Sequence, residues 1–291
     1  MDILERALVP SLTLGCTYAL VAMGFVVLFR AIGILSFAQG AFMVLGALLF
    51  YTFTSSAGLP LVPALVLSLV GSGIAGGLTY NIVYRRVRSA DRLLIAFSTI
   101  GLGLVLQTAL YLIWGTDVRN GPPLLPGLTH VTSLIVFSGY QWFTIALAIA
   151  IFVLIIGWLR FTPNGVRMRA TADSETLASY YGIRVGRIAT IVWSLGALCA
   201  AAGGIAYSSA TAVDPVNLSG LGLVVFPAII LGGVDSLIGC LVGGILVSFI
   251  STIVGIEFGG QYQDMMSYLV LLAMLVIRPA GLFGTPDVAR V

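Results

Sequence analysis

The chain has 291 residues, of which 59% are hydrophobic and 9% are charged, with a formal net charge of +3. Soluble domains carry about 25% charged residues, so this composition excludes an ordinary soluble protein. Apolar runs of about 20 residues recur along the sequence, which is the pattern of membrane-spanning helices. Because backbone groups in lipid must be paired within the protein, we predict an all-α polytopic membrane protein with one transmembrane domain over residues 1–291.

Nine apolar runs are predicted to cross or enter the membrane, at residues 8–29, 38–54, 61–83, 93–114, 141–160, 188–209, 221–233, 236–256 and 264–277. The seventh run is the shortest and is interrupted by Pro227 and the pair Gly232-Gly233, which is typical of a half-helix or a short re-entrant segment. The sequence therefore leaves eight and nine crossings open.

The arginine-rich loops predict which side of the membrane each loop faces, since short cytoplasmic loops are enriched in Lys and Arg. The richest loops are 84–92 and 161–187, and Arg30 and Arg278 fall on the same side as both. We therefore expect the N-terminus outside and the C-terminus in the cytoplasm.

The loop at residues 115–140 then lies outside and is expected to form an ordered cap. It contains the only histidine of the chain, His130, which we interpret as a solvated loop residue. Its short apolar run, Leu134–Phe137, could form a strand.

The residues required by several classes of catalysis are missing. All 14 basic residues are arginines, so the chain lacks the lysine of an ATP-binding P-loop, and it contains no HExxH, CxxC or GxSxG motif. The arginines lie in short loops and do not indicate nucleic-acid binding. Cys16, Cys199 and Cys240 lie in apolar runs and are expected to pack as small residues. We expect this chain to be no enzyme, with no catalytic residue, metal site or cofactor of its own.

The predicted spans also lack charge at mid-depth. Asp235, Glu257 and Asp264 fall at predicted span ends, whereas proton relays place carboxylates or histidines within spans. A nearly uncharged interior suits a neutral or zwitterionic solute, with energy supplied by another subunit.

Glycine pairs at helical spacing predict close helix packing. Gly73/Gly77 and Gly239/Gly243 have the small-xxx-small spacing that lets helix backbones approach. These faces either pack inside the chain or form a subunit interface or a moving pathway.

Three polar stretches in apolar surroundings, at 36–40, 98–107 and 232–236, are candidates for a substrate pathway. A buried amide costs a few kcal/mol unless it is hydrogen-bonded, so Gln39 either staples neighbouring helices or lines a hydrated path. The candidate pathway residues are Ser36, Phe37, Gln39, Gly40, Thr99, Gln107, Gly232 and Gly233.

Two of these stretches also have a local structural interpretation. Ser98 and Thr99 could bond back to carbonyl groups of their own helix. Asp235-Ser236 fits an N-cap for the following span, with a functional hinge as the alternative.

The segment Phe161–Arg187 is the longest polar interruption of the chain. Residues 162–165, Thr-Pro-Asn-Gly, are turn-forming and end the preceding span. Residues 166–181 contain no Gly or Pro and predict one short amphipathic helix along the cytoplasmic surface, which Gly182 ends.

A shorter helix capped by Asp173 or Ser174 is the alternative within this segment. Leu177, Tyr180 and Tyr181 supply an apolar, aromatic face. The segment could also be a lipid-facing interfacial helix with snorkelling arginines.

Five stretches, in order along the chain, resemble the permeases of ABC importers for branched-chain amino acids, urea and short amides. These are LSFAQGAFMVLGA (35–47), Thr99–Gly101 with Trp114-Gly115, GVRMRATADSETLASYYGI (165–183), LGGVDSLIGCLVGGIL (231–246) and IRPAGLFG (277–284). The chain departs from the family at Ser36 and Gln39, where Asn and His are frequent, and at Asp235-Ser236, where a Gly-Ser pair is frequent. The substrate could therefore differ from leucine, isoleucine or valine.

The resemblance implies a permease domain in a bacterial inner membrane that works by alternating access. Its implied partners are a second permease subunit (a paralogue or a second copy), two ABC ATPase subunits that carry ATP and Mg, and an extracytoplasmic solute-binding protein. The cytoplasmic loop would then receive the ATPase stroke. The residues implied in this coupling are Gly165, Arg167, Arg169, Ala170, Asp173, Glu175, Ala178 and Gly182.

Two other classes of function remain open at this point. One is a passive channel or facilitator for small neutral solutes such as urea or amides, which needs no ATPase. The other is a membrane scaffold without transport activity.

Overall fold

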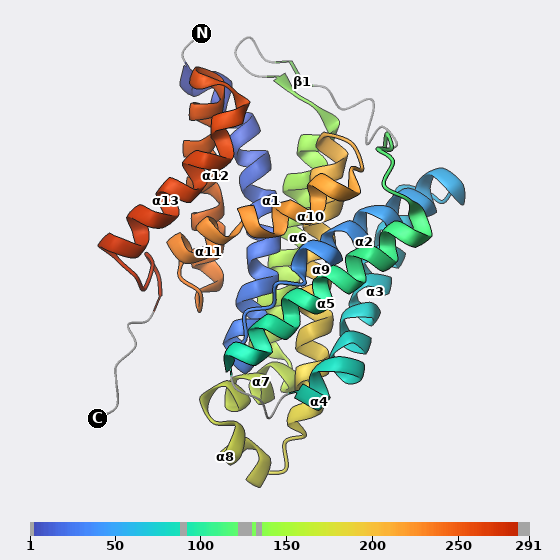
Figure 1. Cartoon of the computed structure of the whole chain (residues 1–291), viewed down its shortest axis with the longest axis vertical. Coiled ribbons are helices and arrows are strands. Elements are labelled where there is room, and N and C mark those ends of the chain that lie inside the picture. The colour runs from blue at the N-terminus through green and yellow to red at the C-terminus, as the bar shows by residue number, and fades with distance from the viewer. Residues whose placement is uncertain (1–2, 88–91, 122–129, 132–135, 285–291) are drawn as a thin grey trace.

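The computed structural model describes residues 3–87, 92–121, 130–131 and 136–284, and these residues are predominantly helical (Figure 1). The prediction of an all-α polytopic membrane protein is confirmed. The helices are α1 (Ile3–Ile32), α2 (Gln39–Tyr51), α3 (Leu61–Thr79), α4 (Arg85–Val87), α5 (Arg92–Trp114), α6 (Gly139–Phe161), α7 (Pro163–Asp173), α8 (Glu175–Tyr180), α9 (Val185–Ala210), α10 (Pro215–Val224), α11 (Phe226–Gly232), α12 (Leu237–Phe258) and α13 (Gln263–Ile277).

Seven helical segments in the described part of the chain are long and apolar enough to cross a membrane. They are Arg6–Ile32, Leu61–Tyr84, Leu94–Trp114, Gly139–Phe161, Val185–Ala210, Pro215–Gly232 and Leu237–Phe258. Helices α2 and α13, with 13 and 15 residues, are shorter than these segments. The expectation of eight or nine crossings therefore stays a prediction.

Helices α1 and α9 form the centre of the bundle. Helix α1 packs along α12 and α9, and α9 also packs against α2 and α3. Small residues allow these close approaches: a Cβ added at Gly46 would overlap Ala201, and one added at Gly204 would overlap the backbone of Met43. The α2–α9 contact is therefore built from backbone meeting backbone.

The predicted glycine pairs are used inside the chain. Gly73 and Gly77 in α3 face residues of α9, whereas Gly239 and Gly243 in α12 face Gly232 and Ala228 of α11. Of the two expectations for these pairs, packing within the chain is confirmed. The three cysteines are free and buried, as expected for packing residues.

Several spans are interrupted or distorted. Residues 33–38 between α1 and α2 are not helical, and α10 gives way to α11 at Val225, two residues before Pro227. Helices α2 and α3 end in π-helical turns at Thr52–Ser56 and Tyr80–Tyr84. The seventh predicted run, 221–233, is thus one part of a longer element made of α10 and α11.

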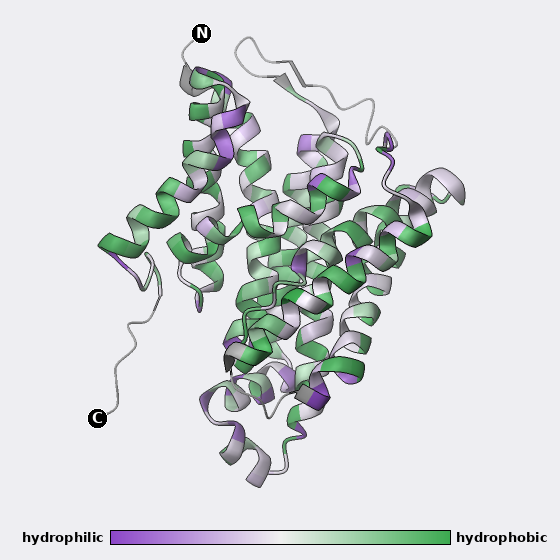
Figure 2. Cartoon of the chain, in the orientation of Figure 1, coloured by the Kyte–Doolittle hydropathy of each residue, from purple (hydrophilic) through white to green (hydrophobic). Residues whose placement is uncertain are grey.

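Polar segments gather at the two ends of the bundle, and the middle is mostly hydrophobic (Figure 2). Helices α4, α7 and α8 lie at one end, and β1 lies at the opposite end (Figure 1). Strand β1 (His130–Val131) pairs antiparallel with β2 (Val136–Phe137). A strand was predicted at Leu134–Phe137, of which residues 134 and 135 lie outside the described residues.

Candidate functional site

The first residue of α2 is a fully buried glutamine. Gln39 is 0% exposed, and neither its amide oxygen nor its amide nitrogen has a hydrogen-bond partner. A Cβ added at Gly24 in α1 would lie 3.3 Å from Gln39 Oε1, and one added at Gly196 in α9 would lie 3.3 Å from Gln39 Nε2. The amide is therefore held between two glycines of the central helices, with its hydrogen-bonding capacity unused.

Three aromatic rings pack together around the non-helical turn that precedes Gln39. Phe37 stacks on Phe226, with ring centroids 5.3 Å apart and an interplanar angle of 7°, and Phe25 meets Phe226 edge-on at 5.2 Å. Phe226 is the first residue of α11, so the break between α10 and α11 presents its ring to the break between α1 and α2.

Helix α5 supports the same turn. The Phe37 N–H donates to Thr99 Oγ1 at 3.0 Å, and the Thr99 hydroxyl donates to the Ala96 carbonyl at 2.7 Å. The expected bond from Thr99 back to its own helix is confirmed, and the hydroxyl has a second role in fixing the turn before α2. Ser98 also bonds back, to the Ile95 carbonyl.

Helix α10 closes the other side of α2. A Cβ added at Gly40 would overlap the carbonyl oxygen of Ser219, and one added at Gly222 would lie 2.8 Å from the Gly40 backbone. Gln107 Nε2 donates to Ser219 Oγ at 2.8 Å, which ties α5 to α10. Ser36 is fully buried nearby in sequence, and its hydroxyl has no partner.

We call these residues the α2-start cluster. It contains six of the eight predicted pathway residues and three that sequence reasoning did not single out. The members are Phe25, Ser36, Phe37, Gln39, Gly40, Thr99, Gln107, Ser219 and Phe226. None of them carries a charge, and together they combine amides, hydroxyls and aromatic rings, of which the Gln39 amide and the Ser36 hydroxyl have no hydrogen-bond partner.

The other two predicted pathway residues lie elsewhere. Gly232 and Gly233 are at the far end of α11, about 9 Å along the helix from Phe226 at 1.5 Å per residue. Gly233 has a φ of 103°, and the backbone there meets the segment 281–284. The Leu282 N–H donates to the Leu231 carbonyl at 2.8 Å, and the Phe283 N–H donates to the Gly232 carbonyl at 3.1 Å.

The turn after this glycine pair confirms a sequence expectation. Ser236 caps α12, with its hydroxyl accepting from the Gly239 N–H at 3.0 Å. The motif at residues 231–236 and the segment 277–284 thus form one interlocked unit that ends α11 and starts α12.

The second candidate region is the segment between α6 and α9, where one helix was expected over residues 166–181. That prediction was wrong, because the segment forms two helices, α7 and α8, separated at Ser174. Ser174 has extended backbone, and its hydroxyl accepts from the Leu177 N–H at 3.3 Å. The alternative of a shorter helix capped by Ser174 is therefore confirmed, and that helix is α8.

The expectation for the start of this segment was wrong, whereas the expectation for its end is confirmed. Gly165 was expected in a turn before the helix but lies within the first turn of α7, which is capped by Thr162. A Cβ at Gly165 would overlap the Leu159 carbonyl oxygen, so this glycine lets α7 pack on the end of α6. Gly182 has a φ of 78°, and the Ile183 N–H donates to the Ala178 carbonyl at 3.0 Å, which confirms that Gly182 ends α8.

The charged residues of this segment lie on its surface. Arg169 donates to the Leu159 carbonyl at the end of α6, and Arg167 donates to Asn164 Oδ1 at 3.1 Å. Asp173 and Glu175 are exposed on either side of the break, whereas Ala170 is half-buried.

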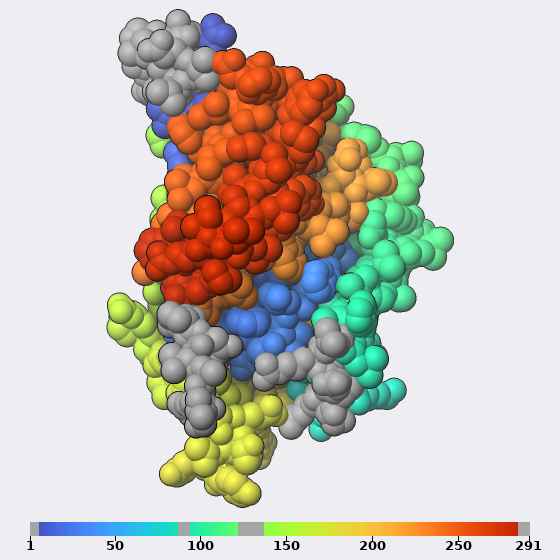
Figure 3. Space-filling model, turned by 60° about the vertical axis from the view of Figure 1, so that its left-hand side comes forward, coloured from blue at the N-terminus to red at the C-terminus, as the bar shows by residue number. Residues whose placement is uncertain are grey.

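The tip of α8 is apolar and exposed. Ala178 faces inward, at 2% exposed, whereas Leu177, Tyr180 and Tyr181 are 59%, 82% and 85% exposed. Figure 3 shows the segment, in yellow-green, projecting from the lower end of the molecule. An exposed aromatic tip flanked by charges is typical of a surface that contacts another protein.

Two of the residues that the sequence did not single out are Phe226, which had a weak signal, and Ser219, which had none. Pro227 marked a break in the seventh apolar run. Its neighbour Phe226 lies at this break and stacks on Phe37. Ser219 had no local signal, because its partner Gln107 is 112 residues away in sequence.

Together, the bundle of apolar helices, the uncharged cluster at two helix breaks and the charged surface segment define a polytopic transport protein of the permease class. Residues 7–277 match the family described as the branched-chain amino acid transport system permease component. The chain belongs to this family, and the resemblance given above is confirmed. Proteins of this family are membrane permeases and not enzymes.

Named relatives align with most or nearly all of the chain. It is 29% identical to the high-affinity branched-chain amino acid transport system permease protein BraD of Pseudomonas aeruginosa, covering 98% of this chain and 97% of BraD. It is 29% identical to LivH of Escherichia coli K12, which has the same description, covering 96% and 95%. It is 25% identical to the ribose import permease protein RbsC of Escherichia coli K12, covering 82% and 77%.

Proposed function

We propose that this chain is the membrane-spanning permease subunit of an ATP-driven importer of branched-chain or other hydrophobic amino acids, or of similar small neutral solutes. The observation that carries the proposal is the family match over residues 7–277. The uncharged α2-start cluster and the exposed α7–α8 segment support it, because a permease needs both a path for its solute and a contact for its energy source.

The α2-start cluster is the proposed solute path. Phe25, Phe37 and Phe226 offer an apolar surface to an aliphatic side chain, and the Gln39 amide offers a donor and an acceptor to polar groups. In Figure 3, blue atoms of the α1–α2 region reach the surface between α13 and α5, and Phe37 in this region is partly exposed. The proposed path would then lie at the edge of the chain, where a second permease subunit would complete it.

The α7–α8 segment is the proposed contact with the ATPase. Its aromatic tip would be buried in the partner, and the exposed charges at Arg167, Asp173 and Glu175 would set the register. Because Gly165 and Arg169 hold α7 against the end of α6, a displacement of the segment is transmitted to a membrane-spanning helix. Nucleotide-dependent docking can then bias an inward-open or outward-open bundle, which is alternating access.

The proposed assembly has further parts. It contains two permease subunits (this chain with a paralogue or a second copy), two ABC ATPase subunits that bind ATP and Mg, and an extracytoplasmic solute-binding protein. We place it in a bacterial inner membrane, with the α7–α8 end and the C-terminus in the cytoplasm, because the arginine-rich loops lie at that end.

The test is uptake by proteoliposomes that contain the full complex, assembled with the permease, ATPase and binding protein encoded beside this gene. We expect ATP-dependent and binding-protein-dependent uptake of labelled leucine, isoleucine or valine. The matched control is the same complex with an ATPase that lacks its P-loop lysine, which should transport nothing. Urea and ribose are compared in the same assay, ribose because a ribose permease is among the relatives.

Two results would contradict the proposal. Equal uptake with and without a working ATPase would favour a passive channel or facilitator. If no ATPase co-purifies with the chain from its native membrane, the proposed mechanism has no energy source.

A further inference from the structure

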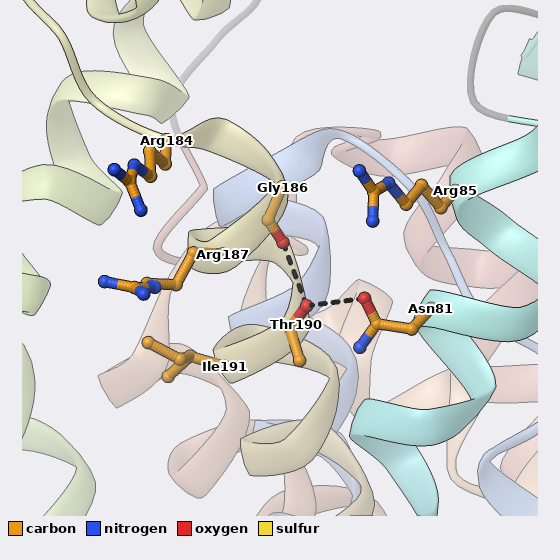
Figure 4. Close-up of a pocket in the computed structure, with 7 residues that line it drawn as sticks. All are labelled: Asn81, Arg85, Arg184, Gly186, Arg187, Thr190 and Ile191. Atoms are coloured by element: carbon orange, nitrogen blue, oxygen red, sulfur yellow. Dashed lines mark hydrogen bonds between the residues drawn. The ribbon is translucent and has the colours of Figure 1, made fainter.

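A cavity of about 580 Å³ lies at the arginine-rich end of the bundle, where α9 begins. Its lining comes from the end of α3 with its π-helical turn, from α4 and from the first turns of α9 (Figure 4). The lining residues are Asn81, Arg85, Arg184, Gly186, Arg187, Thr190 and Ile191.

The cavity is strongly positive. Arg85, Arg184 and Arg187 line it, and no acidic residue is among the described residues that do so. In Figure 4, Arg85 lies on one side of the first turn of α9, and Arg184 and Arg187 lie on the other side. Guanidinium groups stay charged at every physiological pH and bind phosphate through paired N–H donors, so this lining selects an anion, with phosphate a good match.

The rest of the lining is uncharged, includes the apolar Ile191, and has little donor capacity of its own. Thr190 donates to the Gly186 carbonyl at 2.9 Å and contacts Asn81 Oδ1 at 3.4 Å. Gly186 has no side chain, and no side chain caps the first turn of α9. The arginines therefore dominate the recognition, and the open helix start adds a weaker positive field.

An apolar ridge on α3 leads to this cavity. Val70, Ile74, Leu78 and Ile82 are spaced four residues apart, are all exposed and run toward the arginine-rich end. Residues three and four apart are neighbours on a helix surface, so Leu78 adjoins both Asn81 and Ile82, and Asn81 adjoins Arg85. The exposed surface thus changes within one helical turn from branched aliphatic side chains to amide and guanidinium groups.

We propose that this cavity binds the phosphate headgroup of an anionic phospholipid, with one acyl chain along the α3 ridge. The charge of the cavity matches the headgroup, and the ridge matches a hydrocarbon chain at the adjacent depth. A free phosphate ion shares the first feature and not the second, which is why we assign a lipid. The inference does not depend on the transported solute.

The experiment is a titration of the purified full-length chain with phosphatidylglycerol, followed by native mass spectrometry, with phosphatidylcholine as the uncharged reference. We expect phosphatidylglycerol to bind more tightly than phosphatidylcholine. Each arginine near an anionic membrane surface strengthens binding about fivefold, so Arg85→Gln should weaken phosphatidylglycerol binding about fivefold, and the double variant with Arg187→Gln about 25-fold.

Arg85 is the diagnostic position, because Arg184 and Arg187 also line a second cavity that includes Arg167 of the α7–α8 segment. The matched control is Arg86→Gln, at an exposed neighbour that does not line the cavity, and it should bind as the unmodified chain does. Arg85→Lys keeps the charge and should retain most of the affinity.

A second arm separates lipid from free phosphate. Inorganic phosphate at millimolar concentration should not displace phosphatidylglycerol, and Ile82→Ser should weaken the lipid without affecting phosphate. Displacement by inorganic phosphate would overturn the assignment to a lipid. Unchanged lipid binding in Arg85→Gln, with loss of ATPase co-purification, would also overturn it and assign the cavity to a protein partner.

Discussion

The start of α2 and the α7–α8 segment are both rich in polar residues, yet they are built in opposite ways. At the start of α2, Gln39 and Ser36 are fully buried and have unused hydrogen-bonding groups, held by glycine contacts between helices. In the α7–α8 segment, Thr162 and Ser174 cap their helices and the charged side chains are exposed. Substitutions in the buried cluster should therefore affect folding and solute passage, whereas those in the exposed segment should affect contact with other proteins.

The largest effect is expected for Gly40→Ala. The added methyl group would overlap the Ser219 carbonyl, and the backbone of α10 cannot move away cheaply. Overpacking of this kind costs about 1–3 kcal/mol, so thermal stability and the yield of monodisperse protein should both fall. Gly157→Ala in α6 is the control, since a Cβ there meets nothing within 4 Å. A normal yield of Gly40→Ala would show that α2 and α10 pack less closely than described.

The next effect tests the exposed segment. Arg169→Glu places an acid beside the Leu159 carbonyl that Arg169 now binds, and it reverses the charge offered to a partner. ATP-driven uptake should fall about tenfold, within the usual range of coupling energies, while membrane insertion is retained. Uptake and the amount of inserted protein are measured together, with Arg86→Glu in α4 as the control. A fall in uptake that only follows a fall in inserted protein would reduce Arg169 to a structural role.

Gln39→Leu separates function from stability in the buried cluster. The change removes a buried amide without partners, so stability should stay the same or rise by about 1 kcal/mol. Uptake should nevertheless fall about tenfold, which corresponds to one lost hydrogen bond to the solute. Thermal unfolding and initial uptake rates are compared on the same preparation. Equal losses of uptake and of folded protein would instead indicate that Gln39 staples the central helices.

The smallest effect is expected for Gly182→Ala at the end of α8. An alanine at a φ of 78° costs about 1–2 kcal/mol, but the cost falls on one short surface helix. Amide exchange in α8 should become about tenfold faster, with little change in the melting temperature of the whole chain. Gly220→Ala is the control, because its Cβ meets nothing and its φ is not positive. A global loss of stability would mean that α8 supports the bundle.

Local chemistry made part of this structure predictable from sequence. Ser236 as an N-cap, Gly182 as a helix end and Thr99 bonding to its own helix depend on residues within a few positions of each other. The break at Ser174 was harder, since both a long helix and a shorter capped one fitted the same residues; at the break, the Ser174 hydroxyl caps α8.

The remaining features depend on distant parts of the chain. Gln107 reaches Ser219 across 112 residues, and nothing near either residue specifies the other. Phe226 meets Phe37 only because two helix breaks face each other. Gly232 and Gly233 resembled pathway residues by composition, yet Gly232 packs on the backbone of Gly239 in α12, and Gly233 packs on the backbone of 283–284, which comes last in the described chain.

The interlock between α11 and the segment 281–284 has a consequence for biogenesis. The carbonyls of Leu231 and Gly232 receive their partners from Leu282 and Phe283, which leave the ribosome about fifty residues later at roughly 5–20 residues per second. During those seconds the inserted α11–α12 hairpin has two backbone acceptors without their partners. A chain truncated before Gly281 lacks both donors, so the carbonyls of Leu231 and Gly232 never gain these two partners.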